Sequence, residues 1–527
     1  MEKRALIAVV LSILVFYGYT ALFPAKRVEG PAPPPTSAQE QAQPAPAAIP
    51  AVPAAAVSAP APAVRKEITV ESPLYTAVFS TQGGDLVRLV LKRYHEAADP
   101  RSRNVTLVDD PAQGTLLTVA PWAGLDRGTS FTTSADALSV GAGEAKQLVF
   151  TSTAPGGVIL RKTYSFRGGD YGIGLEYSVA NGGAVRVGGP LQTILTYHLA
   201  PDVKESRFET HGPVVFAQDK LIVEKPKDLL GQAKSYQAPT WSGYADKYFL
   251  SALLARGGSI ATASVKALQP GKYEELISSP EIALNPGESR AVSYRLYFGP
   301  KDLDILKAQG ENLERAIDLG WFAVLAKPLL HALKFLHHYV GNYGLAIIII
   351  TVVIKVLFYP LTHSSYKSMK EMQKIQPKMQ ELREKYKNDR ETMNRAIMEL
   401  YQTHKVNPLG GCLPMLVQIP VFFALYKSLM FSIELRHAPF FLWIQDLSAK
   451  DPYYVTPIIM GITMVIQQRM TPSQMDPVQQ KMMMALPVVF TFMFLNFPSG
   501  LVLYWLVNNV LTITQQYYIN KSISARG

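Results

Sequence analysis

The chain has 527 residues, a hydrophobic content of 48% and a formal net charge of +11 at pH 7. This composition is too polar for a chain made only of membrane-spanning helices, so we expect a membrane part joined to a water-soluble part. The basic residues are spread along the sequence and give no argument for a specific nucleic-acid partner. A single cysteine, Cys412, excludes an intramolecular disulfide, and the histidines lack metal-binding spacing, so we expect no metal and no cofactor.

The first 65 residues divide into two stretches of different composition. Residues 1–23 carry Lys3 and Arg4 before a long uncharged run, which predicts a transmembrane signal anchor whose N-terminus lies in the cytoplasm. Residues 24–65 are dominated by proline and alanine. Such a composition cannot bury a core, so this stretch is predicted to be an extended linker.

Residues 66–300 alternate between apolar and polar side chains in short runs separated by glycine-rich turns. The run Val158–Phe166, followed by Gly168 and Gly169, is one example. A period of two predicts antiparallel strands, and the segment is long enough to fold by itself as a β-sandwich. Residues 301–343 change to a helical period, which predicts a connector with an amphipathic helix at the membrane interface.

Apolar runs recur after residue 343. They predict a second transmembrane helix at 344–362 and four more within 407–520, which makes six together with the N-terminal run. The segment 363–405 holds ten Lys/Arg against six Asp/Glu. The positive-inside rule therefore places this segment and a short tail, 521–527, in the cytoplasm and the large domain on the outer side.

Residues 363–406 are predicted to form two helices that pair as an antiparallel cytoplasmic hairpin, with Asn388 and Asp389 between them. Pro377 is expected to kink the first helix or to mark its restart. The pattern fits either a solvated connector or a docking surface for other proteins. The apolar residues at helical steps are Ile375, Met379, Leu382 and Tyr386 in the first helix and Met393, Ile397 and Leu400 in the second.

Lys355 stands inside an otherwise uncharged apolar run, where a cation costs about 3 kcal/mol or more in hydrocarbon. Thr351 and Thr362 share its predicted helical face. Further polar stripes occur in two later spans, formed by Thr463 and Gln467 and by Trp505, Asn508, Thr512 and Gln515. These stripes fit either interhelical hydrogen bonds in a tight bundle or the wall of a water-filled groove.

The predicted spans contain no Asp or Glu, which disfavours an ion-coupled transporter. A lone cation such as Lys355 favours an anionic visitor instead, unless its side chain reaches the nearby cytoplasmic interface. Lys427, inside another predicted span, has no explanation from the sequence beyond the same snorkelling.

Several long motifs occur in a recognisable order. They are Asn407–Pro420, Phe422–Tyr426, Asp451–Tyr454, Asp476–Lys481 and Phe497–Trp505. Together they resemble the bacterial YidC membrane protein insertase family, in its Gram-negative form with a large periplasmic domain. The resemblance covers nearly the whole chain.

The resemblance implies a polytopic α-helical membrane protein with six transmembrane helices and an all-β periplasmic supersandwich domain. Five of the helices would form an insertase core around a hydrophilic groove that opens to the cytoplasm and to lipid. The implied function is that of an insertase and chaperone, not an enzyme, which inserts, folds and helps to assemble inner-membrane proteins. It would act both independently of the Sec translocon and together with it.

The family's groove cation falls on Lys355, where many members carry arginine. Thr351, Tyr504 and Trp505 fall on groove positions, and Gln468 matches beside Gln467. With the polar stripe of the last span, the predicted substrate-groove residues are Lys355, Thr351, Gln467, Gln468, Tyr504, Trp505, Asn508 and Thr512.

The resemblance also implies partners and a location. The partners would be nascent membrane proteins, phospholipids, the Sec translocon with its accessory subunits, and the translating ribosome with the signal-recognition targeting machinery. The short tail after residue 520 gives no sign of a strong ribosome-binding extension. The location would be the bacterial inner membrane, with both termini in the cytoplasm and the large domain in the periplasm.

Two other functions are compatible with the residues. An ion or solute transporter or channel would use the polar stripes as a path open to both sides. A periplasmic carbohydrate enzyme would use the outer domain, because supersandwich folds occur in sugar-processing proteins. The suggestive side chains there are His198, His211 and Asp170, which we interpret as ordinary domain residues.

Overall fold

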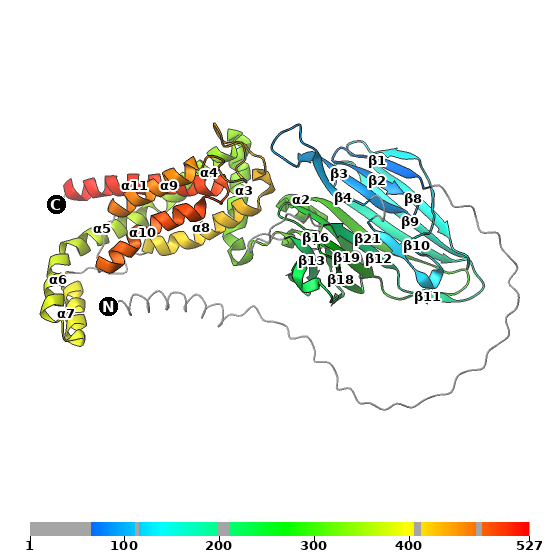
Figure 1. Cartoon of the computed structure of the whole chain (residues 1–527), viewed down its shortest axis with the longest axis horizontal. Helices are drawn as coiled ribbons and strands as arrows, with labels where there is room; N and C mark the ends of the chain where they lie inside the picture. The colour runs from blue at the N-terminus through cyan, green and yellow to red at the C-terminus, as the bar shows by residue number, and fades with distance from the viewer. Residues whose placement is uncertain (1–64, 111–114, 199–210, 405–412, 471–476, 526–527) are drawn as a thin grey trace, which may run out of the picture. The chain divides into compact units, whose positions relative to one another are not determined.

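The computed structural model describes residues 65–110, 115–198, 211–404, 413–470 and 477–525. The predicted anchor at 1–23 and almost all of the predicted linker at 24–65 lie outside these residues. Within them, strands occupy residues 67–300 and helices dominate from residue 303 onward (Figure 1). An all-β domain followed by a helical part is the predicted fold class, which is confirmed at this level.

The strands form four sheets whose named neighbours are antiparallel, except for the parallel pair β1 and β7. The first sheet has the order β4(Asn104–Asp109), β3(Asp85–His95), β2(Tyr75–Ser80), β1(Glu67–Glu71), β7(Ala137–Ser139). The largest sheet has the order β14(Lys220–Val223), β13(Gly212–Ala217), β16(Trp241–Ala245), β17(Phe249–Ala255), β21(Ser289–Pro300), β10(Gly172–Asn181), β9(Val158–Arg167), β8(Ala145–Thr153), β6(Thr132–Thr133). The others are β15(Lys234–Gln237), β18(Thr262–Gln269), β19(Lys272–Ser278), β12(Gln192–His198), β5(Leu117–Val119), and the pair β11(Val187–Gly189), β20(Ile282–Leu284).

Strand β9 shows how the alternating pattern builds the core. Leu160, Tyr164 and Phe166 point inward, as the period of two predicts. Lys162 points inward as well and is fully buried, with Nζ 3.0 Å from Asp85 Oδ1. A buried ammonium needs a partner, and Asp85 supplies it from the start of β3 in another sheet.

The helices after the β domain are α2(Leu303–Gln309), α3(Ala323–Val340), α4(Tyr343–Leu357), α5(Tyr359–Lys374), α6(Gln376–Lys385), α7(Arg390–Thr403), α8(Leu413–Phe431), α9(Val455–Met470), α10(Pro477–Phe494) and α11(Ser499–Ala525). Short 3-10 turns include η3(Leu313–Ala316), η4(Gly320–Phe322) and η6(Ile433–Leu435). No single helix among the described residues is both long and apolar enough to pass for a membrane span, whereas α4 and α5 pass as a pair bent by 60°. The predicted number of six transmembrane helices therefore stays a prediction.

The transmembrane helix predicted at 344–362 stays a prediction, but it is not one straight helix, because the chain bends by 60° after Leu357. Phe358 has φ −89° and ψ 5°, and α5 begins at Tyr359. Pro360 is the second residue of α5 and lacks the N–H that a continuous helix would need, so it breaks the ladder. Thr362 therefore lies in α5, where its hydroxyl donates to Phe358 O, and it does not continue the face of Lys355.

Two other helix ends test the sequence predictions. Pro377 is the second residue of α6, so the predicted restart of the hairpin's first helix is confirmed. Most of the predicted tail at 521–527 is helical, since α11 continues to Ala525, and its cytoplasmic location stays a prediction. The segment between Asn520 and Ala525 contains no glycine or proline to end the helix.

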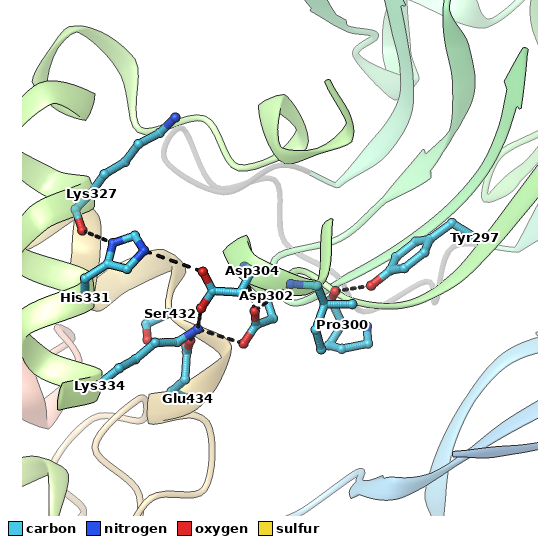
Figure 2. Close-up of polar contacts among 10 residues, drawn as sticks. Tyr297, Pro300, Asp302, Asp304, Lys327, His331, Lys334, Ser432 and Glu434 are labelled. Carbon is cyan, nitrogen blue, oxygen red and sulfur yellow. Dashed lines mark hydrogen bonds and ion pairs between the residues drawn. The ribbon is translucent and has the colours of Figure 1, made fainter. Parts of the chain in front are cut away.

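Helices α2 and α3 and the turn η6 meet at an ion cluster around Lys334 (Figure 2). Lys334 Nζ lies 3.0 Å from Asp302 Oδ2, 2.7 Å from Asp304 Oδ2 and 2.9 Å from Glu434 Oε1. Asp302 also caps α2, since its Oδ1 accepts from the backbone N–H groups of Asp304 and Ile305. Burial lowers the pKa of Lys334, but Glu434 and the two aspartates outweigh burial and raise it above its ordinary value.

Candidate functional site

Lys355 joins α4 to α11. Its Nζ donates to Thr512 Oγ1 at 2.8 Å, and Thr512 Oγ1 donates in turn to Asn508 O at 2.6 Å. Gln515 Nε2 donates to the backbone carbonyl of Lys355 at 3.4 Å. The hydroxyl of Thr512 thus serves as an acceptor for the ammonium and brings the predicted residues Lys355 and Thr512 together, whereas Asn508 takes part only through its backbone carbonyl, one turn before Thr512.

Helices α4, α8, α9, α10 and α11 contain no Asp or Glu. Lys355 is partly buried, and among the described residues its ammonium has a hydroxyl partner and no ion pair with a carboxylate. Neutral acceptors compensate a cation less than a carboxylate does. The site is therefore suited to an anionic or strongly polar ligand.

Two side-chain oxygens on the face of α11 that carries Thr512 are buried without a hydrogen-bond partner among the described residues, Asn508 Oδ1 and Gln515 Oε1. Because Gln515 Nε2 faces a carbonyl, which can only accept, the orientation of its amide is fixed and Oε1 remains an acceptor. An unpaired buried acceptor costs about 1–3 kcal/mol. A donor such as a peptide N–H would relieve that cost.

Thr351 lies one turn before Lys355 in α4 and is buried. Its hydroxyl donates to Ile347 O at 2.6 Å within the same helix. The proton is therefore used locally, so Thr351 offers only acceptor lone pairs to its surroundings.

Tyr504 and Trp505 form a second group, about 12 Å along α11 from Thr512 at the usual helical rise. Tyr504 is buried and accepts a 2.8 Å hydrogen bond from Gln418 Nε2 of α8. Trp505 packs edge-on against Phe422 and contacts Phe494 of α10. These two predicted residues thus connect α11 with α8 and α10 rather than with Lys355.

Gln467 and Gln468 lie near the end of α9 and are partly buried. Hydrogen bonds between α9 and α11 include two that the sequence did not predict. Asn509 Nδ2 donates to Thr463 Oγ1 at 3.2 Å, and Gln516 Nε2 donates to Met470 O at 2.7 Å.

The sequence predictions missed Asn509, Gln516 and Gln418. Asn509 and Gln516 are seven residues apart, which puts them on one face of α11 and was an available signal. Gln418 stands inside the motif Asn407–Pro420, where an amide in an apolar helix is itself a signal.

The hairpin helices α6 and α7 contact each other through part of the predicted seam. Met379 is buried and its sulfur accepts a 3.0 Å hydrogen bond from Tyr401 OH. Ile375 and Met372 pack against Leu400 and Tyr401. The remaining predicted seam residues are partly buried, namely Leu382, Tyr386, Met393 and Ile397.

Three residues singled out earlier have structural partners. Lys427 Nζ lies 4.8 Å from the ring centroid of Phe431, one turn later in α8, and this cation–π contact partly compensates its charge. His198 Nε2 lies 3.3 Å from Asp110 Oδ2. Asp170 pairs with Arg295 at 2.7 Å and accepts from Gln309, so it links β21 to α2.

Comparison with known proteins identifies the family. Residues 335–526 match the family described as 60Kd inner membrane protein, and residues 67–332 match the YidC periplasmic domain. The Membrane protein insertase YidC of Geobacter metallireducens is 71% identical over 536 residues, covering 100% of this chain and 99% of that protein. This chain belongs to the YidC membrane protein insertase family.

A second YidC insertase, from Geobacter sulfurreducens, is 69% identical over 526 residues and covers 99% of each chain. A solved structure of an active YidC insertase with its first transmembrane domain resolved is 19% identical, with a TM-score of 0.38, over 86% of this chain and 92% of that one. Family membership confirms the resemblance drawn from the motifs. In YidC terms, the strands at 67–300 form the periplasmic-type domain, and the helices that follow form the insertase part.

Proposed function

We propose that this protein inserts other proteins into the bacterial inner membrane and that the polar residues around Lys355 receive the polar segment of the client. One observation carries the second part of the proposal. The ammonium of Lys355 is held by the hydroxyl of Thr512, between helices that contain no carboxylate. The counter-ion of Lys355 would then be transient and would arrive on the client.

The electrostatic gain is of the right size for transient binding. One carboxylate at about 4 Å from the ammonium gains roughly 4 kcal/mol at an effective dielectric of 20. That is comparable to the cost of keeping the cation in an apolar environment. Asn508 Oδ1 and Gln515 Oε1 supply acceptors for peptide N–H groups of the same segment.

The apolar segment of the client would leave along the lipid-facing sides of the helices. Helix α10 exposes Val488, Val489 and Phe492, and α8 exposes Ile419 and Phe423. These side chains offer a hydrophobic surface next to the aromatic group around Trp505. A client whose short polar tail rests at Lys355 needs to cross only part of the bilayer, so no nucleotide or metal chemistry is required.

The remaining assignments are parts of the same proposal. The boundaries are an anchor at 1–23, a linker at 24–65, a periplasmic domain at 66–300, a connector at 301–343, a hairpin at 363–406 and transmembrane helices at 344–362 and 407–520. Both termini would be cytoplasmic. The hairpin would be a docking surface, and the Sec translocon, the targeted ribosome and phospholipids would be partners.

A reconstituted insertion assay tests the proposal. Purified protein in liposomes receives a short client with an acidic tail, and protease protection measures insertion. Lys355→Glu should reduce insertion of this client at least tenfold, because it replaces attraction by repulsion, while Lys355→Arg should retain it. Normal insertion of the acidic client by the Lys355→Glu variant would contradict the proposed role of the cation.

A further inference from the structure

The loop between α8 and α9 exposes a group of large apolar side chains. Phe441, Leu442 and Tyr453 are 67%, 62% and 68% exposed. We call these three residues the tip patch. A group of large exposed apolar side chains on one loop is typical of an interaction surface.

The loop is built to hold the tip patch outward. Phe440 N donates to Ile444 O at 2.9 Å and Ile444 N donates to Phe441 O at 3.1 Å, which closes a tight turn. Leu442 has φ +53°, a left-handed conformation that costs a residue with a side chain about 1 kcal/mol or more. Phe441 and Leu442 therefore lie in a tight, hydrogen-bonded turn.

The base of the loop is anchored by Asp451, which is buried. Its Oδ1 accepts from Trp443 Nε1 at 3.1 Å, and its Oδ2 accepts from the backbone N–H of Thr456 at 2.8 Å. The Trp443 ring lies edge-on to Tyr453, with 6.4 Å between centroids. Asp451 therefore ties the tip patch to the beginning of α9.

The loop that carries the tip patch is joined to the end of α3, and α3 has its own apolar stripe. Asn342, between α3 and α4, caps α4 through Oδ1 and donates from Nδ2 to Phe440 O at 3.0 Å. Gly344 packs against the Phe440 ring so closely that a Cβ there would lie 2.0 Å from it. Large exposed side chains run along α3 and the turn before it, namely Trp321, Val324, Phe335 and Tyr339.

The loop between α8 and α9 also carries a cation, Lys450. Lys450 is exposed, with Nζ 3.3 Å from Tyr454 OH and 5.6 Å from the Tyr454 ring centroid. Aromatic rings beside a lysine are the side chains found at the headgroup level of membranes, where the rings enter the acyl boundary and the ammonium meets phosphate. The loop joins two helices that the proposed function places in the membrane.

We infer that the tip patch inserts into the outer leaflet of the bilayer at the boundary between headgroups and acyl chains, with phospholipid as its partner. Together with the stripe on α3, it sets the depth of the outer ends of α4 and α9. This inference rests on the proposed function, because it takes α8 and α9 as membrane helices.

The test measures lipid contact in the full chain reconstituted into liposomes. Cys412→Ser removes the native cysteine, and single cysteines at 442, 353 and 268 are labelled with a fluorophore. Lipids that carry a nitroxide near the headgroup should quench the probe at 442 strongly, and lipids that carry it on the acyl chain should quench the probe at 353. A probe at 268, on β18, should remain unquenched by both. A label at Phe441→Cys repeats the measurement if Leu442→Cys does not fold.

The other possible quenching patterns each overturn either the tip-patch inference or the proposed function. Val353 of α4 is 57% exposed and should face lipid, so quenching at 353 without quenching at 442 overturns the tip-patch inference alone. No quenching at 353 or 442 contradicts the membrane placement and thus the proposed function. A probe at 442 shielded from both aqueous iodide and nitroxide lipid would show a protein partner and overturn the assignment to phospholipid.

Discussion

Lys355 Nζ and Thr512 Oγ1 are 2.8 Å apart, so the cation of α4 is bound by a hydroxyl of α11. Thr512→Val removes that hydroxyl at nearly constant volume. Insertion of a client with an acidic tail should fall about tenfold or more, because a hydrogen bond to a charged group contributes about 1.5–3 kcal/mol. Reconstituted insertion measures the effect.

Thr514→Val is the matched control, since Thr514 is exposed and donates to Val510 O within its own helix. Equal losses from the two variants would show that Thr512 acts only through the general stability of α11.

The Lys334 cluster predicts a stability effect at the junction of α2, α3 and η6. Lys334→Met leaves Asp302, Asp304 and Glu434 close together without their cation. Removing one partner of a buried pair costs about 3–5 kcal/mol, and the exposure of Asp304 reduces this to about 2–3 kcal/mol. The apparent melting temperature in detergent should fall clearly for Lys334→Met and much less for Lys334→Arg. A fall of the same size in Lys327→Met would contradict a specific role of the cluster.

Glu275 predicts a pH dependence of the β domain. It is fully buried in β19, contacts the Ser242 hydroxyl and accepts from Tyr197 OH. Burial raises its pKa from 4.5 to about 8, against the opposing hydrogen bond from Tyr197. The folded protein binds the proton of Glu275 more tightly than the unfolded chain does. The contribution of this proton to the free energy of unfolding is therefore fully present below pH 4.5 and is lost as the pH rises toward 8.

Glu275→Gln mimics the neutral acid and should remove this loss. A pKa difference of one unit equals about 1.4 kcal/mol, so the variant should exceed the parent protein by several kcal/mol at pH 9 and by little at pH 5. Circular dichroism of the β signal during heating measures it. Glu281→Gln, at an exposed position, is the control, and parallel pH profiles for Glu275→Gln and the parent protein would refute the prediction.

The contact between Met379 and Tyr401 holds α6 and α7 together, and we expect its loss to reduce insertion. Met379→Asp places a charge against α7, so the hairpin should become more sensitive to limited proteolysis and insertion should decrease. Met398→Asp, at a position that is 55% exposed on α7, should change neither. Unchanged insertion by a proteolytically loosened Met379→Asp variant would show that hairpin packing is not needed.

The spacing of side chains along the sequence predicted those features of the fold that depend on residues close together in the chain. The alternation along β9 and the helix restart at Pro377 follow from side-chain spacing and from the missing N–H of proline. The same reasoning failed at Phe358, where the apolar run continues and only Pro360 signals the bend. An apolar run shows that a segment is hydrophobic but does not show whether it forms one straight helix.

Contacts between distant residues could not be predicted from spacing. Gln418 meets Tyr504 across 86 positions, and Lys162 meets Asp85 across 77. Each pair depends on which helices or sheets pack together, and one sequence does not reveal that. The family resemblance predicted Lys355 to be a groove residue, but its hydrogen bond to Thr512 became evident only from the packing of α4 on α11.

Site-specific crosslinking to a stalled client tests the central claim most directly. A photoreactive residue replaces Asn508, which neighbours Thr512, or Val510, which is 45% exposed on another face of α11. Position 508 should crosslink to the client's polar tail, position 510 should not, and Lys355→Glu should abolish the crosslink from 508 for an acidic tail. Equal crosslinking from both positions, or a crosslink from 508 that Lys355→Glu leaves unchanged, would contradict binding of the client tail at Lys355.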